Sequence, residues 1–374
     1  EQGQGGLVTA LAPVLRNRGG LWIGWPGTTD ASALEAVRAV PAEKTGYTIE
    51  PVALSDEELE LYYHGFSNEI LWPLFHDMPG RCTFDPDYWP VYRRVNRRFA
   101  DTVARCTGDN SYVWVQDYHL MLVADELRRA GVARTTGFFL HIPFPPVDIF
   151  IKMPWRFQVL EALLRFDLVG FQTRRDMRNF IACLRALMPG LQMTTRYRAG
   201  EVTLDGHTAH VGAFPIGIDH RKFIEATRSK EVADRAWFIH EELPEHKVIL
   251  GVDRLDYTKG IPQRIDAFAL ALERHPEMRR RVVLVQVVVP SREDVPEYAE
   301  LRVDIERRIS RVNGRFTESG WAPIQYIYRA LTMQDLLAYY RTSEIALVTP
   351  LKDGMNLVAK EFCACSLEQG VLVL

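Results

Sequence analysis

The chain has 374 residues, a length that accommodates two domains of ordinary size. Its formal net charge of −3 gives no overall basic surface of the kind that binds nucleic acid. It contains no run of about 18 apolar residues that would cross a membrane, and its polar first residues are not those of a signal peptide, so we expect a cytoplasmic protein without nucleic-acid or membrane partners.

Strand and helix patterns alternate in the first half of the chain. Short apolar runs of strand length each precede a stretch in which apolar residues recur at helical spacing. The strands are predicted at 112–117, 136–142 and 167–172, and the helices at 118–129, 149–164 and 175–187. A polar, β-rich stretch then ends at 215–218.

The same alternation restarts in the second half. Residues 282–289 are almost all β-branched or apolar, as expected of a strand that is covered on both faces. The strands are predicted at 247–252, 282–289, 324–328, 345–349 and 371–374, and the helices at 262–273, 298–312, 333–341 and 357–367.

Repeated strand–helix units predict an α/β protein whose parallel sheets have helices on both faces. A break near 217–245 indicates two domains, because one sheet with this many strands would be unusual. We expect the domains at 1–217 and 218–374. In such folds ligands bind beyond the carboxyl ends of the strands.

Residues 353–361 read DGMNLVAKE and directly follow a predicted strand. The N-terminus of a helix carries unpaired N–H groups and a partial positive charge, which suit a phosphate. Asp353 and Glu361 lie on either side of it, and carboxylates accept hydrogen bonds from sugar hydroxyls. The segment therefore indicates a sugar joined to a phosphate, that is, a nucleotide sugar.

Basic residues follow two other predicted strands. Arg254 and Lys259 would neutralise a diphosphate and stabilise charge on a departing nucleotide. The alternative is a surface loop in which they pair with Asp253 and Asp256. Arg292 is the candidate for a second phosphate, and a solvated loop arginine is its alternative.

Asp117 and His141 each end a predicted strand, where both could point into a cleft between the domains. A helix N-cap is the alternative role for Asp117, and a core histidine is the alternative for His141. The prolines that follow His141 form a stiff turn, which would fix its orientation.

Glycine and aromatic residues in the first 75 positions are weaker candidates. Gly5 and Gly6 precede a run in which apolar residues recur at helical spacing over 7–15. The two glycines would let backbone amides approach a ligand, although a flexible loop explains them equally well. Aromatic residues among glycines can form platforms for sugar rings, although most tryptophans belong to a core. These aromatic residues are Trp22, Trp25, Tyr63 and Trp72.

Cysteine and histidine usage points away from metal chemistry. The five cysteines are an odd set without a C-x-x-C pair, which fits reduced thiols. His207 and His210 lie in a strand-like stretch, where positions three apart point to opposite faces. We therefore expect no metal and no cofactor.

Together these segments resemble the trehalose-6-phosphate synthase family of retaining glycosyltransferases. The matching stretches follow the family's order over almost the whole chain: GGLWIGWPG, YYHGFSNEILWPLFH, QDYHL, GFFLHIPFP, DLVGFQT, FPIGID, DRLDYTKG, PSRED and TPLKDGMNLVAKE. The resemblance implies a GT-B fold of two facing Rossmann-like domains with the active site in the cleft between them. It also implies that the family's opening strand and closing helices have no counterpart within these 374 residues.

The resemblance implies transfer of glucose from a nucleoside-diphosphate glucose to glucose 6-phosphate, giving α,α-trehalose 6-phosphate. Uridine diphosphate glucose is the family's usual donor, and the guanosine and adenosine forms stay open here. Configuration is retained without a metal, and the departing phosphate takes the acceptor's proton. The alternatives are a glucosylglycerol-phosphate synthase, which shares the donor half, and a catalytically silent sugar-phosphate-binding homologue. A homo-oligomer is compatible with the sequence.

Site residues carry over by motif, with acceptor binding expected mainly in the first domain and donor binding mainly in the second. The residues expected at the reacting groups are Arg254, Lys259, His141 and Asp353. The donor-binding residues are Gly6, His141, Arg254, Lys259, Asp353, Gly354, Met355, Asn356, Leu357 and Glu361. The acceptor-binding residues are Trp25, Tyr63, Trp72, Asp117 and Arg292.

Overall fold

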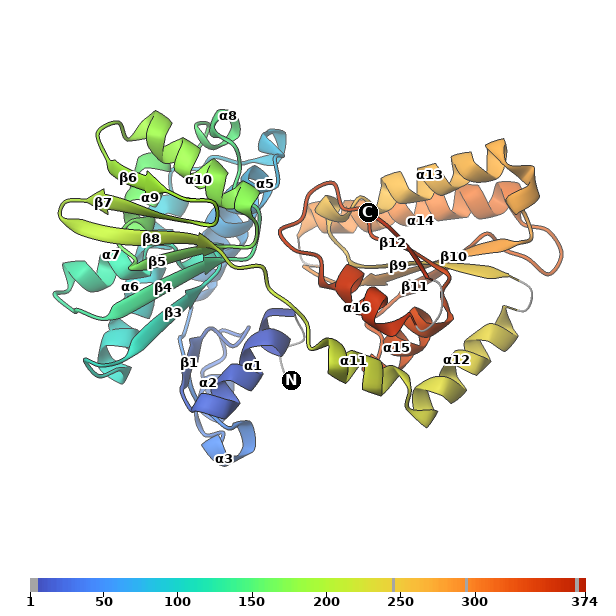
Figure 1. Cartoon of the computed structure of the whole chain (residues 1–374), viewed down its shortest axis with the longest axis horizontal. Helices are drawn as coiled ribbons and strands as arrows, with labels where there is room; N and C mark the ends of the chain where they lie inside the picture. Colours follow the sequence, from blue (N-terminus) through green and yellow to red (C-terminus); the bar gives the residue numbers. More distant parts are fainter. Residues whose placement is uncertain (1–5, 244–245, 293–294, 367–369) are drawn as a thin grey trace. The chain divides into compact units, whose positions relative to one another are not determined.

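The computed structural model describes residues 6–243, 246–292, 295–366 and 370–374 (Figure 1). The chain divides into two compact units, Glu1–Ile216 and Gly217–Leu374, which we call unit 1 and unit 2. Each has its own sheet flanked by helices. The assignment of acceptor binding to one and donor binding to the other stays a prediction.

Unit 1 is built on a six-stranded sheet with the strand order β3-β4-β5-β8-β7-β6. The four parallel strands are β3 Tyr112–Gln116, β4 Thr135–Leu140, β5 Leu168–Phe171 and β8 His207–Ala213. The antiparallel hairpin of β6 Gln192–Thr195 and β7 Ala199–Leu204 continues the sheet. Because β7 is antiparallel to β8 and β6 is antiparallel to β7, β6 runs in the same direction as β8. It therefore ends at the same edge of the sheet as the four parallel strands. The three strands predicted here are confirmed, each within about two residues.

In the first 106 residues of unit 1 the helical run over 7–15 is confirmed as part of α1, and the other elements were not predicted. A two-stranded parallel sheet pairs β1 Leu21–Gly24 with β2 Thr48–Pro51. The helices are α1 Gly6–Arg18, α2 Ala31–Arg38, α3 Ala42–Thr45, α4 Asp56–Glu58, α5 Trp72–Phe75, the 3₁₀ turn η2 Pro79–Arg81 and α6 Tyr88–Cys106. Between α4 and α5 lies a π-helix, η1 Leu59–Leu71, which ends with the Trp72 amide donating to the Ser67 carbonyl five residues back.

The remaining helices of unit 1 follow its parallel strands. They are the 3₁₀ turn η3 Tyr118–Leu120, α7 Val123–Arg129, α8 Val147–Phe150, α9 Arg156–Leu163 and α10 Arg174–Leu187. The prediction of one helix over 149–164 was wrong, because α8 and α9 are separate. Pro154 lies between them, and proline lacks the N–H that a continuous helix needs. The helix expected over 118–129 likewise opens as a 3₁₀ turn.

Unit 2 has a five-stranded parallel sheet with the order β11-β10-β9-β12-β13. The strands are β9 Lys247–Arg254, β10 Val282–Val289, β11 Ile324–Tyr328, β12 Ile345–Leu347 and β13 Val371–Val373. The helical elements are α11 His220–Thr227, α12 Lys230–Glu242, η4 Tyr257–Lys259, α13 Ile261–Arg274, η5 Pro276–Met278, α14 Pro296–Phe316, α15 Met333–Thr342 and α16 Leu357–Cys365. The strands and helices predicted for this half are confirmed, although β12 ends two residues early. The two helices α11 and α12 lie in the predicted break near 217–245.

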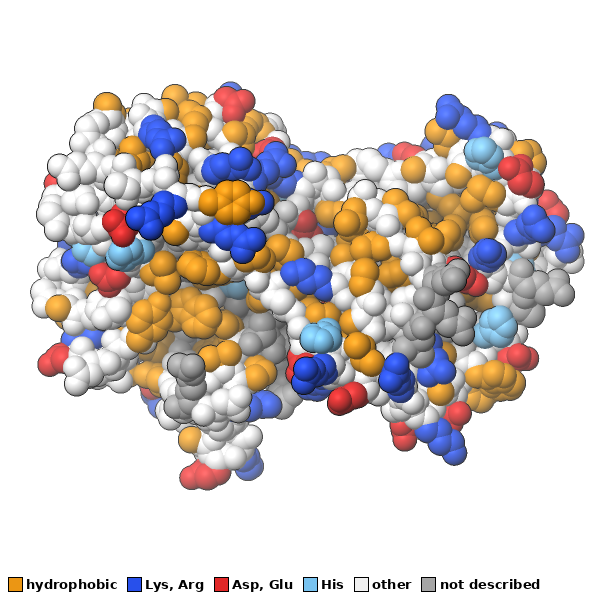
Figure 2. Space-filling view, in the orientation of Figure 1, with side chains coloured by type: hydrophobic (Ala, Val, Ile, Leu, Met, Phe, Trp, Pro, Cys, Tyr) orange, Lys and Arg blue, Asp and Glu red, His pale blue; other side chains and the backbone are white. Residues whose placement is uncertain are grey.

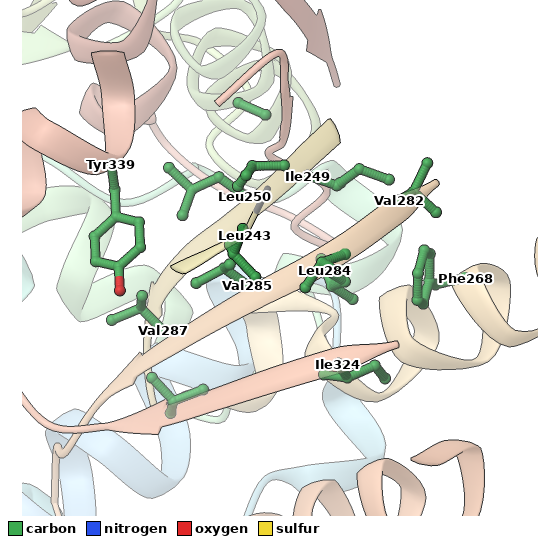
Figure 3. Close-up of a cluster of buried hydrophobic side chains, with 14 of the residues drawn as sticks. Leu243, Ile249, Leu250, Phe268, Val282, Leu284, Val285, Val287, Ile324 and Tyr339 are labelled. Carbon is green, nitrogen blue, oxygen red and sulfur yellow. The ribbon is translucent and has the colours of Figure 1, made fainter. Parts of the chain in front are cut away.

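The core of unit 2 lies on both faces of its central strands. All but the last residue of β10 are buried, as the run of β-branched and apolar residues predicted. Figure 3 shows Leu284, Val285 and Val287 of β10 beside Leu250 of β9 and Ile324 of β11. Full burial of each such side chain contributes roughly 1.5–3 kcal/mol. This core fixes the strand ends from which the loops described next emerge.

Candidate functional site

Two loops of unit 2 meet at the carboxyl edge of its sheet. Strands β9 and β12 are neighbours in the sheet, with Ile249 opposite Ile345. The Leu351 amide donates to the Thr258 carbonyl at 2.8 Å and so joins the loop after β12 to η4. Lys259 Nζ donates to Asp353 Oδ2 at 2.7 Å. The sheet therefore brings together two site residues that are 94 positions apart in the sequence.

The Lys259–Asp353 ion pair lies at the start of α16. Its side chains are only 11% and 19% exposed. Asn356 Nδ2 also donates to Asp353 Oδ2, at 3.2 Å. The Asn356 Oδ1 accepts from the Ala359 amide at 3.1 Å and caps the helix. A carboxylate and an ammonium group are thus held at the positive end of a helix, where an anion is favoured.

A tight turn allows Lys259 to reach this position. Gly260 has φ of 65°, and a Cβ there would lie 2.6 Å from the Thr349 carbonyl oxygen. Glycine therefore both adopts the left-handed conformation and permits the close approach of the two loops. Upstream, the Asp256 carboxylate accepts from the amide and the hydroxyl of Thr258, at 2.9 and 2.8 Å.

A buried arginine that the sequence analysis missed ties the loops together. Arg264 on α13 is 3% exposed and donates to Asp253 Oδ2 at 2.5 Å. It also donates to Thr349 Oγ1, at 3.1 Å, and to the Lys259 carbonyl, at 3.4 Å. Asp253 and Asp256 are therefore occupied by Arg264 and Thr258. This contradicts the surface-loop alternative, in which they would pair with Arg254 and Lys259.

Arg254 and Arg292 follow the neighbouring strands β9 and β10 at the same edge of the sheet. Arg254 is the last residue of β9 and lies opposite Val289, the last residue of β10. Arg254 is exposed and forms no ion pair with the described residues. Arg292 follows β10 with φ of 51° and donates to the Tyr298 hydroxyl at 2.6 Å. Arg292 thus belongs to unit 2, whereas the other acceptor candidates belong to unit 1.

The second carboxylate of the segment 353–361 lies one turn into α16. The Tyr340 hydroxyl of α15 donates to Glu361 Oε2 at 2.9 Å. Burial raises the pKa of Glu361, and the hydrogen bond from Tyr340 opposes that rise. Between the two carboxylates Gly354 is buried, and Met355, Asn356 and Leu357 are half-buried. The predicted donor residues of unit 2 therefore converge on the start of α16 and the adjoining loops.

Asp117 and His141 are brought together at the carboxyl edge of unit 1. The His141 amide donates to Asp117 Oδ1 at 3.1 Å, and the Asp117 amide donates to the Phe139 carbonyl at 2.8 Å. Asp117 has φ of 67° and ψ of 172°, a region populated almost only by glycine. Such strain costs about 1–3 kcal/mol and is typical of functional sites. Its side chain does not cap the following turn, so the N-cap alternative is wrong.

Two glutamines fix the proton on the His141 ring. The Ile216 amide donates to Gln172 Oε1 at 2.9 Å, so the Gln172 NH₂ group faces His141 Nδ1, at 3.3 Å. Nδ1 must therefore accept, which leaves the proton on Nε2, and Nε2 donates to Gln116 Oε1 at 2.8 Å. Burial lowers the pKa of His141 to about 4, so the ring is neutral. Within the described part of the chain, Gln116 Nε2 is buried without a hydrogen-bond partner.

The aromatic candidates of unit 1 fall into two environments. Trp25 and Tyr63 lie 5.3 Å apart between ring centroids, and Tyr63 stacks on His119 at 5.7 Å. Trp72 is 5% exposed, so little of its ring can touch a ligand. Trp22 packs against Tyr47 at 6.2 Å. Their contact with an acceptor sugar stays a prediction.

Gly6 is the first residue of α1 rather than part of a loop, and Gly5 lies outside the described residues. In the ranges that the structure describes, no group of three or more His, Cys, Asp or Glu side chains could hold a metal ion. Over the same ranges, no helix has the length and apolar character needed to span a membrane.

Two α/β units, each with polar groups at the carboxyl edge of a mainly parallel sheet, define a protein of the Rossmann-like class. The family model described as Glycosyltransferase family 20 matches residues 1–374. The chain therefore belongs to glycosyltransferase family 20 and is a glycosyltransferase with the GT-B fold.

Named relatives agree with this family. The trehalose-6-phosphate synthase of Mycolicibacterium gilvum is 46% identical over 371 residues, which cover 98% of this chain and 74% of the relative. That of Mycobacterium leprae is also 46% identical, over 372 residues covering 98% and 74%. These relatives favour neither the glucosylglycerol-phosphate synthase nor the silent homologue.

Solved structures are similar over nearly the whole chain. One is described as trehalose-6-phosphate from E. coli bound with UDP-2-fluoro glucose; it has a TM-score of 0.90 and 36% identity, covering 99% of this chain and 81% of that one. Another is an alpha,alpha-trehalose-phosphate synthase (UDP-forming) from Burkholderia xenovorans in complex with glucose-6-phosphate, with a TM-score of 0.92 and 35% identity, covering 99% and 82%.

Proposed function

We propose that this chain transfers glucose from uridine diphosphate glucose to glucose 6-phosphate, with retention of configuration, and so makes α,α-trehalose 6-phosphate. The similarity to named trehalose-6-phosphate synthases supports the reaction. The observation that carries the proposal is the Lys259–Asp353 pair at the start of α16. It sets a cation and a sugar-binding carboxylate beside a helix end that favours a phosphate.

In this proposal most of the donor-binding residues lie along the carboxyl edge of unit 2. Arg254 and Lys259 bind the diphosphate, together with the amides at the start of α16. Glu361 accepts hydrogen bonds from the ribose, and Asp353 accepts from the glucose hydroxyls. Arg254 suits the leaving group because its charge is not committed to a neighbouring carboxylate among the described residues.

For glucose 6-phosphate the proposal keeps the residues that the resemblance implies. Arg292 and Tyr63 bind its phosphate, and Asp117, Trp25 and Trp72 contact its ring. The strained backbone of Asp117 supports this role, because its carboxylate is held by the His141 amide rather than turned to solvent.

The proposed mechanism needs no protein acid or base. His141 is neutral above its pKa of about 4, so in this proposal it positions the donor glucose without supplying a proton. The acceptor hydroxyl passes its proton to the departing phosphate as the new glycosidic bond forms on the same face of the sugar. Catalysis then comes from positioning the two sugars and from stabilising the leaving diphosphate.

The test is to incubate the purified protein with uridine diphosphate glucose and glucose 6-phosphate and to follow the product by NMR. We expect a non-reducing phosphorylated disaccharide in which both anomeric protons have the small coupling of α-linkages. Competition with guanosine and adenosine diphosphate glucose identifies the donor base. Absence of the disaccharide, or a product formed only with glycerol 3-phosphate, contradicts the proposal.

A matched pair of variants tests the role of the Lys259–Asp353 pair. Lys259→Met should lower kcat/KM by about 10²–10³, the usual loss for one electrostatic donor to a developing charge. Lys230→Met removes the same charge from the exposed first turn of α12 and should leave kcat/KM unchanged. Equal turnover in the two variants would remove Lys259 from the reaction.

A further inference from the structure

Unit 1 carries a hollow formed by α10 and the turn after β6. Its volume is about 340 Å³. Figure 2 shows Lys and Arg side chains gathered around apolar ones on the face of unit 1 that carries these elements. Its cationic side chains are Arg174, Arg178, Arg185 and Arg196.

Helical spacing and one turn bring these arginines to a common surface. Arg174 and Arg178 are four positions apart on α10, so they share a face, and Arg178 Nε donates to the Arg174 carbonyl at 3.3 Å. Arg185 donates to Thr195 Oγ1 at 3.2 Å and so links the helix to the end of β6. Arg196 follows in the turn. One helix therefore supplies three of the four arginines, and the contact between Arg185 and Thr195 brings the fourth beside them.

No acidic side chain of the described residues lines this hollow. Asp176 on the same helix is 5% exposed, and its carboxylate accepts from the Phe144 amide at 3.1 Å. Glu201 on the neighbouring strand lies 3.6 Å from His210 instead. None of the four guanidinium groups forms an ion pair with a carboxylate of the described residues. Four positive charges therefore share one surface of a chain whose net charge is −3.

An exposed aromatic ring and an apolar floor complete the hollow. Tyr197 is 73% exposed, and the Arg174 guanidinium lies 4.0 Å from its ring centroid, which orients that arginine. Met177 and Ile181 are buried beneath. The hollow lies at the end of β6, separated from β4 and His141 by β5, β8 and β7. It is therefore distinct from the group around His141.

We propose that this hollow binds a small anion that carries at least two phosphate groups. Guanidinium groups match phosphate geometry with paired hydrogen bonds. A phosphate carries about 1.5–2 negative charges near neutral pH, so two of them balance four arginines. A cavity of about 340 Å³ takes a small molecule rather than a segment of nucleic acid.

The test uses inorganic pyrophosphate as the probe in isothermal titration calorimetry of the whole chain. The variant Arg178→Ala/Arg185→Ala removes two charges from the hollow. Its control, Arg93→Ala/Arg97→Ala, removes two exposed charges from α6 of the same unit. We expect a binding event that the first variant weakens at least tenfold and the control leaves unchanged, and we expect inorganic phosphate to bind at least tenfold more weakly than pyrophosphate.

Three outcomes would overturn the proposal. Equal pyrophosphate binding by all three proteins would place the event elsewhere, for example at Arg254 and Lys259. Equal weakening by both double variants would indicate general attraction to a positive surface. Equal affinity for phosphate and pyrophosphate would mean that the arginines do not act as a group. Thermal melting of each variant excludes loss of the fold as the cause.

Discussion

The two units hold their site residues by different physical means. In unit 2 the groups are charged and paired, as in Lys259–Asp353 and the buried Arg264–Asp253. In unit 1 the central group is neutral, and His141 is held between two glutamine side chains. A charged diphosphate requires fixed cations, whereas a sugar carries no charge and can also be positioned by an oriented neutral group. The contrast therefore matches the donor role proposed for unit 2 and the sugar-positioning role proposed for His141.

The largest expected effect tests whether unit 2 depends on its buried charges. Arg264→Met leaves Asp253 buried without its partner and should lower the free energy of unfolding by about 3–5 kcal/mol. Urea unfolding measures this. Arg264→Met/Asp253→Leu removes both charges and should recover most of the loss. If the double variant is as unstable as the single one, packing rather than charge pairing explains the effect.

A second arginine of unit 2 should show the opposite behaviour. Arg254→Ala should reduce transition-state stabilisation by about 3–4 kcal/mol, because it removes a donor to the leaving diphosphate. Since Arg254 is exposed, the melting temperature of the variant protein should equal that of the unmodified chain. Arg274→Ala, at the exposed end of α13, is the control and should retain full kcat/KM. Near-normal turnover of Arg254→Ala would exclude it from the leaving-group role.

In unit 1 the neutral histidine should make stability depend on pH. The pKa of His141 is about 4 in the folded chain and 6.5 ordinarily, so its contribution is fully present above pH 6.5 and is lost as pH falls through 4. The free energy of unfolding that is lost in this way is roughly 3 kcal/mol. Urea unfolding at pH 7 and 4.5 should show a smaller loss for His141→Gln than for the unmodified chain. His240→Gln, on the exposed side of α12, should behave like the unmodified chain. Identical pH dependence in all three would contradict this assignment.

The smallest effect concerns the strained backbone of unit 1. Asp117→Gly should be more stable than Asp117→Ala by about 1–2 kcal/mol, because only glycine tolerates this backbone region without cost. Both lose the carboxylate, so the difference in urea unfolding isolates the strain. At Asp101, inside α6, the order should reverse, with alanine more stable by about 0.5–1 kcal/mol. The same order at both positions would mean that the strain at Asp117 is small.

The sequence predicted those parts of the fold whose signal is local. Strand β10 was recognisable because both of its faces are buried, and α15 because its apolar residues recur at helical spacing. In contrast, η1 and α6 went unpredicted, although α6 has a well-defined buried face. In the first 111 residues only the helical run over 7–15 was predicted, and it lies in α1.

The site was predictable only where a motif marks it. Asp353, Lys259, Asp117 and His141 each follow a strand, so the rule on strand ends found them. The same rule applies to Gln172, which ends the strand predicted at 167–172, but an uncharged glutamine there did not indicate its contact with His141. Arg264 lies within a helix, and its contact with Thr349 joins residues 85 positions apart, so no local feature distinguishes it before the chain is folded.

The π-helix η1 fixes the number of residues between Tyr63 and Trp72. Each residue added to or removed from an α-helix turns everything beyond it by about 100°. A single deletion between Tyr63 and Trp72 would leave Tyr63 in place and turn the Trp72 ring away from Tyr118, whose ring centroid now lies 5.7 Å from that of Trp72. Substitutions in this segment can therefore be accommodated more easily than any change in its length.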